Sequence, residues 1–252
     1  MNKKRAQQIF NALNKTSKTV LHKKKFSFSY KSDFLEYKSY LSNFSSEQYQ
    51  LFDGLFTELA VQDSIQSLFA GAIVNQTENR PALHYQYRTP HPTPEFNFRK
   101  ICAPLLQKIK KEKYKNIITF GIGGSYEGPK LLQEFLLNPA SDINYSFVSG
   151  PDKHEFNVIV KPLLGQKNLY IFASKSLATE ETLSCLKWLG KNRTDKNSIV
   201  ITANSEGARA LGFADSSIVP FPESVGGRYS IWSPISLTAS IENNFMGFLQ
   251  GG

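Results

Sequence analysis

The hydrophobic pattern of the chain changes near residue 115. Beyond that point, short and mostly apolar runs alternate with segments of helix length. The runs are NIITF (116–120), NYSFVS (144–149), NLYIFAS (168–174), NSIVITA (197–203) and SSIVPF (216–221). Runs with so few polar positions are typical of strands that are covered on both faces. Five such strands joined by four crossovers predict an α/β domain with a parallel sheet and helices on both faces.

The order of these strands decides which loops can share a site. For five strands of this kind the order 2-1-3-4-5 is a common solution, and ligands then bind outside the carboxyl ends of strands 1 and 3. Strand 1 ends in GIGGS (121–125), and strand 3 runs into SKSLAT (174–179). We therefore expect the two loops that are richest in glycine and hydroxyl groups to be neighbours.

The segment before residue 96 has a different pattern. SSEQYQLFDGLFTELAVQDSIQSLFAG (45–71) carries apolar residues at helical spacing, and NRPALHYQYR (79–88) suggests a further helix with Pro81 near its first turn. The proline-rich TPHPTPEF (89–96) reads as a connector. We predict a helical N-terminal region (1–95), an α/β domain (96–222) and a final glycine-arginine segment with a helix (223–252).

Charge is distributed unevenly along the chain. The formal net charge is +9, but residues 1–40 alone carry ten Lys or Arg against two Asp or Glu. HKKKFSFSYK (22–31) interleaves lysines with aromatic residues, as a single-strand nucleic-acid binder does. The alternative is a solvated basic segment followed by an alternating strand. Because the other 212 residues carry 20 Lys or Arg against 19 Asp or Glu, we expect no nucleic-acid partner.

Composition also narrows the compartment and the chemistry. No apolar run approaches the roughly 18 residues of a membrane helix, and the basic start MNKKRAQQIF lacks the apolar core of a secretion signal. Cys102 and Cys185 are isolated, and no histidine or cysteine cluster has metal-ligand spacing. We expect a cytoplasmic protein with no membrane contact and no bound metal.

The glycine turn excludes two familiar phosphate sites. Gly121, Gly123 and Gly124 are followed by a glycine at 128, which is not G-x-G-x-x-G, and no G-K-[ST] occurs. Neither a nicotinamide nor a nucleoside-triphosphate site follows from it. Glu127, beside the turn, could act as a base by position, although a first-turn acid favoured by the helix dipole is the simpler interpretation.

The loop after strand 3 has the chemistry of a phosphate site. It offers the hydroxyls of Ser174, Ser176 and Thr179, the charge of Lys175, and backbone amides at a helix start, which suit a dianion. Ordinary helix capping by serine or threonine is the alternative. One loop alone favours capping, whereas two such loops at adjacent strand ends favour a phosphomonoester site.

A third segment, ESVGGRYSIWSPISLTASI (223–241), adds a cation. Gly226 and Gly227 let the backbone approach a ligand closely, and Arg228 has a planar fork that suits an oxyanion. The alternative is a surface arginine at a turn, which GGR alone would not exclude.

Taken together, FGIGGSYEGP, ASKSLATEET and SVGGRYSIWSPISLTASI, in that order, resemble the glucose-6-phosphate isomerase family, as does the upstream NQTENRPALHYQYR. The resemblance covers roughly residues 65 to 252. It implies a sugar-isomerase domain and an aldose–ketose isomerase that interconverts glucose 6-phosphate and fructose 6-phosphate through an enediolate, without a metal or organic cofactor.

The resemblance also implies roles for individual residues. Ser174, Lys175, Ser176 and Thr179 would line the phosphate site, Gly124, Ser125 and Gly227 would contact the sugar phosphate, and Arg228 would face the enediolate oxygen. The sequence departs from the family where Ser176 and Ala178 stand in place of threonines, which puts the phosphate affinity in question. Glu127 stands where the family has an apolar residue.

The largest departure concerns length, because family members are about twice as long. Their base glutamate, in a Q-x-x-x-E motif, their ring-opening histidine and a C-terminal lysine belong to a second half, and no Q-x-x-x-E occurs here. The chain thus resembles the N-terminal half of an enzyme that is a homodimer when complete, and we expect residues 1–252 alone to be inactive. The alternative is a non-catalytic sugar-phosphate-binding module.

Overall fold

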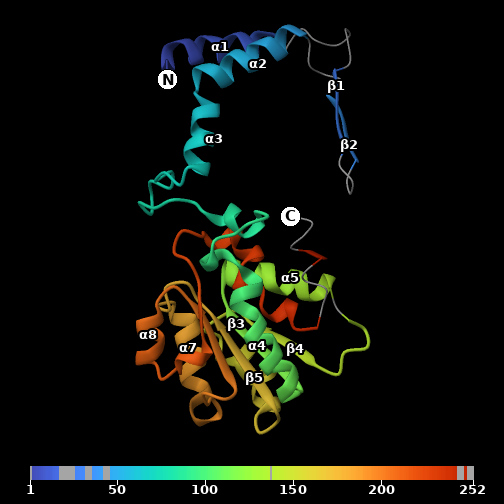
Figure 1. Cartoon of the computed structure of the whole chain (residues 1–252), viewed down its shortest axis with the longest axis vertical. Helices are drawn as coiled ribbons and strands as arrows, with labels where there is room; N and C mark the ends of the chain where they lie inside the picture. Colours follow the sequence, from blue (N-terminus) through green and yellow to red (C-terminus); the bar gives the residue numbers. More distant parts are fainter. Residues whose placement is uncertain are drawn as a thin grey trace. The chain divides into compact units, whose positions relative to one another are not determined.

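The computed structural model describes residues 2–16, 26–31, 36–41, 46–136, 138–242 and 247–248 of the 252-residue chain (Figure 1). The chain divides into two compact units, Met1–Pro81 and Ala82–Gly252. The predicted boundary at residue 95 lies inside the second unit. The reason is that Tyr87 and Phe96 are buried in the hydrophobic core of that unit, and the Leu83 amide donates to the Ser224 carbonyl at 3.1 Å.

The first unit contains helices and one antiparallel strand pair. Helices α1 (Lys3–Thr16) and α2 (Ser46–Glu58) pack together, and an Arg5–Glu58 ion pair of 2.9 Å joins them. Helix α3 (Val61–Phe69) follows a single left-handed residue, Ala60. The helices expected over 45–71 are present.

Residues 26–31 and 36–41 form strands within the region 1–95 that was predicted to be helical, and the alternating strand considered for HKKKFSFSYK is confirmed. Strand β1 (Phe26–Lys31) pairs with β2 (Glu36–Leu41). The alternating pattern FSFSYK has a period of two, which favours a strand over a helix. The preceding basic residues 22–25 lie outside the described part of the chain.

The second unit is built on a five-stranded parallel sheet. Its strands are β3 (Asn116–Gly121), β4 (Asn144–Val148), β5 (Asn168–Ala173), β6 (Ser198–Thr202) and β7 (Ile218–Pro220). They are hydrogen-bonded in the order β4-β3-β5-β6-β7, and every pair is parallel. The predicted order 2-1-3-4-5 is therefore confirmed.

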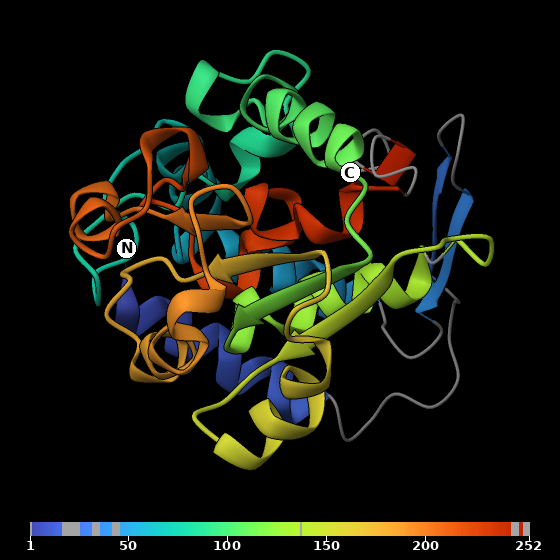
Figure 2. The ribbon, with the colours of Figure 1, turned by 90° about the horizontal axis from the view of Figure 1, so that it is seen from below.

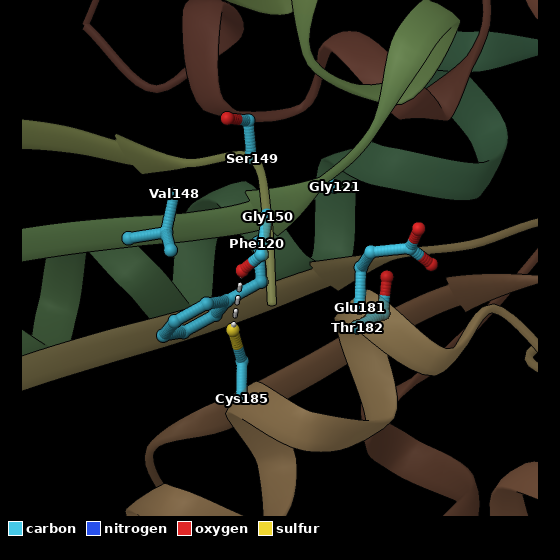
Figure 3. A pocket seen from close by; sticks show the side chains of 8 residues that line it. All are labelled: Phe120, Gly121, Val148, Ser149, Gly150, Glu181, Thr182 and Cys185. Carbon is cyan, nitrogen blue, oxygen red and sulfur yellow. Dashed lines mark hydrogen bonds between the residues drawn. The ribbon is translucent and has the colours of Figure 1, made fainter. Parts of the chain in front are cut away.

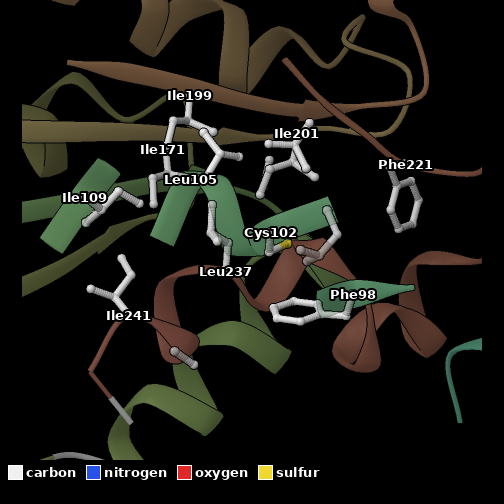
Figure 4. Packing of buried hydrophobic residues seen from close by; sticks show 14 of the residues in the cluster. Phe98, Cys102, Leu105, Ile109, Ile171, Ile199, Ile201, Phe221, Leu237 and Ile241 are labelled. Carbon is white, nitrogen blue, oxygen red and sulfur yellow. The ribbon is translucent and has the colours of Figure 1, made fainter. Parts of the chain in front are cut away.

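Helices lie on both faces of the sheet (Figure 2). Alternate residues of the central strands belong to two separate hydrophobic cores, one on each face. Ile171, Ile199 and Ile201 face helix α4 (Phe98–Glu112), which presents Phe98, Cys102, Leu105 and Ile109 to them (Figure 4). Leu132 of α5 (Glu127–Phe135) and the late residues Leu237 and Ile241 complete this core.

The opposite core contains residues of the other parity. Phe120, Tyr170 and Phe172 pack there with residues of α6 (Lys153–Ile159), α7 (Glu180–Leu189) and α8 (Ser205–Ala210). The Phe120 and Phe172 rings stack at 4.9 Å between centroids. Because both faces are covered, the central strands β3, β5 and β6 are buried along their whole length.

The segment 79–88 does not form the predicted helix. It contains only a short 3-10 helix, His84–Arg88. Asn79 adopts a left-handed backbone with φ of 50°, and Asn75 and Arg80 exchange backbone hydrogen bonds of 3.2 Å. This local turn, together with the long-range hydrogen bond from the Leu83 amide to the Ser224 carbonyl, overrides a weak helix propensity.

No helix within the described ranges is long and apolar enough to cross a membrane.

Candidate functional site

Two of the predicted loops meet at the carboxyl edge of the sheet. Gly121, the last residue of β3, pairs with Ala173, the last residue of β5. Ser125 and Ser174 therefore follow adjacent parallel strands at the same edge, as the strand order predicted. The loop after β3 and the loop after β5 leave the sheet side by side.

The glycine turn requires its glycines. A Cβ at Gly121 would lie 2.5 Å from the carbonyl oxygen of Ser125, and Gly123 has a φ of 56°. The Ser125 amide closes the turn by donating to the Ile122 carbonyl at 3.1 Å. The Ser125 hydroxyl is half-buried and forms no hydrogen bond within the described residues, so it is free to meet a ligand.

The loop 174–179 is held in a compact conformation by its own hydroxyl groups. Ser174 Oγ accepts from the Leu177 amide and shares a hydrogen bond with Thr179 Oγ1, both at 3.1 Å. Leu177 has a left-handed backbone with φ of 51°, and the Ala178 amide donates to Ser176 Oγ at 3.2 Å. Ser174 is buried, whereas Ser176 is exposed.

Helix α7, which follows this loop, has no side-chain cap. Thr179 is its N-cap residue, but the hydroxyl bonds to Ser174 and not to an amide of α7. By contrast, Asp152 caps α6 and Asn204 caps α8 with side-chain hydrogen bonds. The capping alternative for Thr179 is therefore not realised, and the first-turn amides of α7 keep their capacity to bind an anion.

The glycine-arginine segment packs directly on the glycine turn. A Cβ at Gly124 would collide with the carbonyl group of Gly227. Ser230 Oγ lies 2.7 Å from the Gly227 carbonyl oxygen and 3.2 Å from that of Gly124, so one hydroxyl joins the two segments. Backbone contact this close is possible only because Gly124 lacks a side chain.

Arg228 is the unpaired cation of this arrangement. Its side chain is exposed and has neither an ion pair nor a hydrogen bond in the part of the chain that the structure describes. It stands one residue after Gly227 and thus beside the glycine turn. Glu127, in contrast, is simply the first residue of α5 and is exposed, where a carboxylate interacts favourably with the helix dipole.

The side chain of Lys175 leads away from its own loop. Its ammonium donates to the carbonyl oxygens of Glu223 and Val225, at 3.2 and 3.5 Å. The lysine thus joins the loop 174–179 to the segment that carries Arg228. Three segments that are far apart in the sequence are consequently in contact through Gly124, Gly227 and Lys175.

A narrow crevice, too tight to hold a water molecule, lies at the carboxyl ends of β3 and β4, against the start of α7 (Figure 3). Its walls include Ser149, Gly150, Glu181 and Thr182, to none of which a role was assigned from the sequence, although ASKSLATEET contains Glu181 and Thr182. The Thr182 hydroxyl is buried and has no hydrogen-bond partner within the described residues. The strand order could have indicated Ser149, because β4 ends beside β3.

Two titratable groups in this region have pKa values shifted toward the neutral form. Burial, with the charge of Glu155, raises the pKa of the Cys185 thiol to about 12, so this cysteine is no nucleophile at neutral pH. The His84 ring stacks on Tyr229, with centroids 4.3 Å apart. Burial, with a smaller contribution from Arg88, lowers the pKa of His84. Within the described ranges, no three His, Cys, Asp or Glu side chains gather as metal ligands.

Comparison with known proteins identifies the family. The model of the family described as phosphoglucose isomerase matches residues 40–252. A glucose-6-phosphate isomerase of Pseudomonas fluorescens is 30% identical over 250 residues, covering 86% of this chain and 45% of that protein. The enzyme of the same name from Pseudomonas putida strain GB-1 is 31% identical over 245 residues, covering 84% of this chain and 44% of that protein.

The fold has a solved counterpart. A crystal structure of a glucose-6-phosphate isomerase from Chlamydia trachomatis superposes with a TM-score of 0.65 and 19% sequence identity, over 82% of this chain and 44% of that one. The chain spans less than half the length of the curated relatives it matches. On the match over residues 40–252, the chain belongs to the phosphoglucose isomerase family.

Proposed function

We propose that this chain provides the phosphate site and the catalytic arginine of a glucose-6-phosphate isomerase. The observation that carries the proposal is the meeting of three segments at one sheet edge, with Arg228 unpaired beside them. The family membership supports it independently.

In this proposal the phosphate binds at the loop 174–179. The uncapped amides of α7 and the hydroxyls of Ser176 and Thr179 donate to its oxygens, and Ser125 donates from the neighbouring turn. Gly124 and Gly227 allow the sugar to approach the backbone. Ala178 offers no hydroxyl, so the site depends more on Thr179 than a threonine-rich loop would.

Arg228 acts at the other end of the substrate. Isomerisation removes a proton from carbon 2 of the aldose and returns one to carbon 1, while the carbonyl oxygen gains and then loses negative charge. A guanidinium beside that oxygen stabilises the enediolate more than the substrate, which is the condition for lowering the barrier. The resemblance assigns the base to a Q-x-x-x-E motif, which residues 1–252 do not contain. The proposal is therefore that this chain alone binds the sugar phosphate but does not isomerise it.

A non-catalytic sugar-phosphate-binding module is the second candidate. Arg228 discriminates between the two, because a pure phosphate binder needs no cation at the position of the enediolate oxygen. Preferential binding of an enediolate mimic would favour the isomerase, and equal binding of mimic and substrate would favour the module.

The test is calorimetric titration of the full chain with glucose 6-phosphate, glucose and inorganic phosphate. We expect glucose 6-phosphate to bind most tightly and glucose not to bind. Thr179→Val, which removes one hydroxyl, should lower the affinity for glucose 6-phosphate about tenfold. Thr57→Val is the control, because Thr57 is on α2 and its hydroxyl bonds only within that helix. Equal affinities in the wild type and Thr179→Val would contradict the phosphate assignment.

A coupled assay with fructose 6-phosphate, on material checked for host isomerase, measures turnover separately. We expect none above background. Turnover near that of a complete enzyme would show that residues 1–252 contain a base, and Glu127 would then be the first residue to mutate.

A further inference from the structure

Lys175 is anchored at both of its ends. Its carbonyl oxygen accepts from Thr202 Oγ1 at 3.0 Å and from the Ala203 amide at 2.9 Å, which fixes its main chain to the end of β6. Its ammonium donates to the carbonyl oxygens of Glu223 and Val225. The side chain therefore spans from the loop after β5 to the chain that leaves β7.

The segment that Lys175 reaches is itself a short, well-fixed turn. The Phe221 amide donates to the Thr202 carbonyl at 2.9 Å, and the Val225 amide donates to the Pro222 carbonyl at 3.2 Å. Val225 is fully buried in the core on the α4 face. From Val225 only two residues lead to Gly227 and one more to Arg228, so the position of this turn sets where the guanidinium begins.

We propose that Lys175 is a positioning residue for Arg228, and that it couples occupation of the loop 174–179 to the order of the segment 223–231. The inference rests on the proposed function for the identity of the ligand, and on the contacts of Lys175 alone for the coupling. This positioning role differs from the simplest interpretation of Ser174-Lys175-Ser176, in which the Lys175 ammonium binds the phosphate directly.

The physical argument follows from where the ammonium is used. A lysine ammonium donates hydrogen bonds and accepts none, and here it donates to two carbonyl oxygens of one turn. When an anion binds at the loop 174–179, any displacement of that loop is transmitted through the Lys175 side chain to the turn that contains Glu223 and Val225. The two ends of a sugar phosphate, its phosphate and its reacting carbon, would then be recognised by segments that move together.

Hydrogen exchange of peptides from 223–231, measured on the full chain with and without glucose 6-phosphate, tests the coupling. In the wild type, the sugar phosphate should slow exchange there. In Lys175→Met, exchange should be about tenfold faster without ligand, and ligand should no longer slow it. Lys175→Arg should restore part of the response, because it keeps donors and charge. Lys187→Met, an exposed lysine of α7, is the control and should behave as the wild type.

Titration separates positioning from direct phosphate contact. Inorganic phosphate reports on the phosphate contacts, which are the loop 174–179 and Ser125, whereas glucose 6-phosphate also reports on the Arg228 side. For Lys175→Met we expect the affinity for glucose 6-phosphate to fall at least threefold more than the affinity for inorganic phosphate. Equal losses for both ligands, with unchanged exchange at 223–231, would overturn the inference.

The proposed function can fail without the coupling failing. If the wild type binds no sugar phosphate, the proposed function is wrong for this chain. The hydrogen exchange of Lys175→Met without ligand still shows whether Lys175 holds the segment 223–231 in place. If that exchange equals the wild type, Lys175 does not hold the segment.

Discussion

In the proposed site, Arg228 recognises a different part and a different state of the ligand from the residues that bind the phosphate. The phosphate contacts are the same in substrate and transition state, whereas charge at the sugar oxygen exists only in the enediolate. Arg228→Lys keeps the positive charge but loses the planar fork. Because this difference is confined to the enediolate, substitution should leave binding of glucose 6-phosphate nearly unchanged.

A sugar-phosphate hydroxamate mimics the planar, charged enediolate and so reports on this difference. We expect Arg228→Lys to lower the affinity for the hydroxamate about tenfold more than the affinity for glucose 6-phosphate, both measured by titration of the full chain. Equal loss for both ligands would assign Arg228 to recognition of the ground state.

Thr182 is a buried polar residue with a foreseeable effect on stability. Thr182 is only 3% exposed, and its hydroxyl has no hydrogen-bond partner among the described residues. Thr182→Val keeps the shape and removes the hydroxyl, so it should raise the free energy of unfolding by about 1 kcal/mol. Urea denaturation measures this, with Thr182→Ser as the variant that keeps the hydroxyl. A loss of stability in Thr182→Val would mean that the hydroxyl has a partner.

The contact between the glycine turn and the glycine-arginine segment is a matter of space. Gly124→Ala places a methyl group against the Gly227 carbonyl, where neither backbone can yield easily. We expect it to lower the free energy of unfolding by about 1–3 kcal/mol, as overpacking does. Gly226→Ala is the matched control, since its nearest neighbour is Tyr229 at 3.6 Å. Equal effects in the two variants would argue against the close approach.

The 3-10 helix His84–Arg88 is held to the 3-10 helix Gly227–Trp232 in part by stacked rings. His84 packs on Tyr229, and Arg88 lies over the Trp232 ring at 5.6 Å. The pKa of His84 is lowered in the folded chain from its ordinary value of 6.5. The unfolded chain therefore binds a proton at a higher pH than the folded chain does, and stability falls as the pH drops below about 6.5.

His84→Phe keeps a ring in the stack and removes the titration. Between pH 8 and pH 5 we expect the wild type to lose more stability than His84→Phe, measured as the shift of the urea midpoint. The two proteins should differ least at pH 8. Parallel losses over the whole range would show that His84 is not the group responsible.

Much of this architecture could be predicted from the sequence, because it depends on local patterns. The apolar runs gave the five strands, and short connections with right-handed crossovers restrict their order. The neighbouring positions of Ser125 and Ser174 follow from that order. The segment 79–88 was misjudged, because its conformation depends on Asn79 and on a hydrogen bond from Leu83 to Ser224.

The contacts that assemble the site are long-range and could not be read from the sequence. Nothing near Gly227 in the sequence indicates that its carbonyl meets Gly124, and nothing near Lys175 shows that its ammonium reaches Glu223 and Val225. Thr182 escaped notice because an unpaired hydroxyl is a property of packing, not of a motif.

The molecule as a whole places its proposed chemistry in the second unit, residues 82–252, at one edge of one sheet. The first unit holds 11 Lys or Arg against seven Asp or Glu, and the second holds 19 against 14, so net charge does not indicate which unit binds an anion. Another basic group, Lys110, Lys113 and Lys115, lines a separate pocket near the amino end of β3. Both ends of the sheet therefore carry groups that attract an anion. The position of a bound anion is the observation that distinguishes the two sites.

The most direct measurement is a crystal structure of the full chain soaked with glucose 6-phosphate. The account predicts the phosphate within hydrogen-bond distance of the Ser176 and Thr179 hydroxyls, with the sugar directed toward Arg228. A sugar phosphate that is instead bound among Lys110, Lys113 and Lys115, with the loop 174–179 empty, would contradict it.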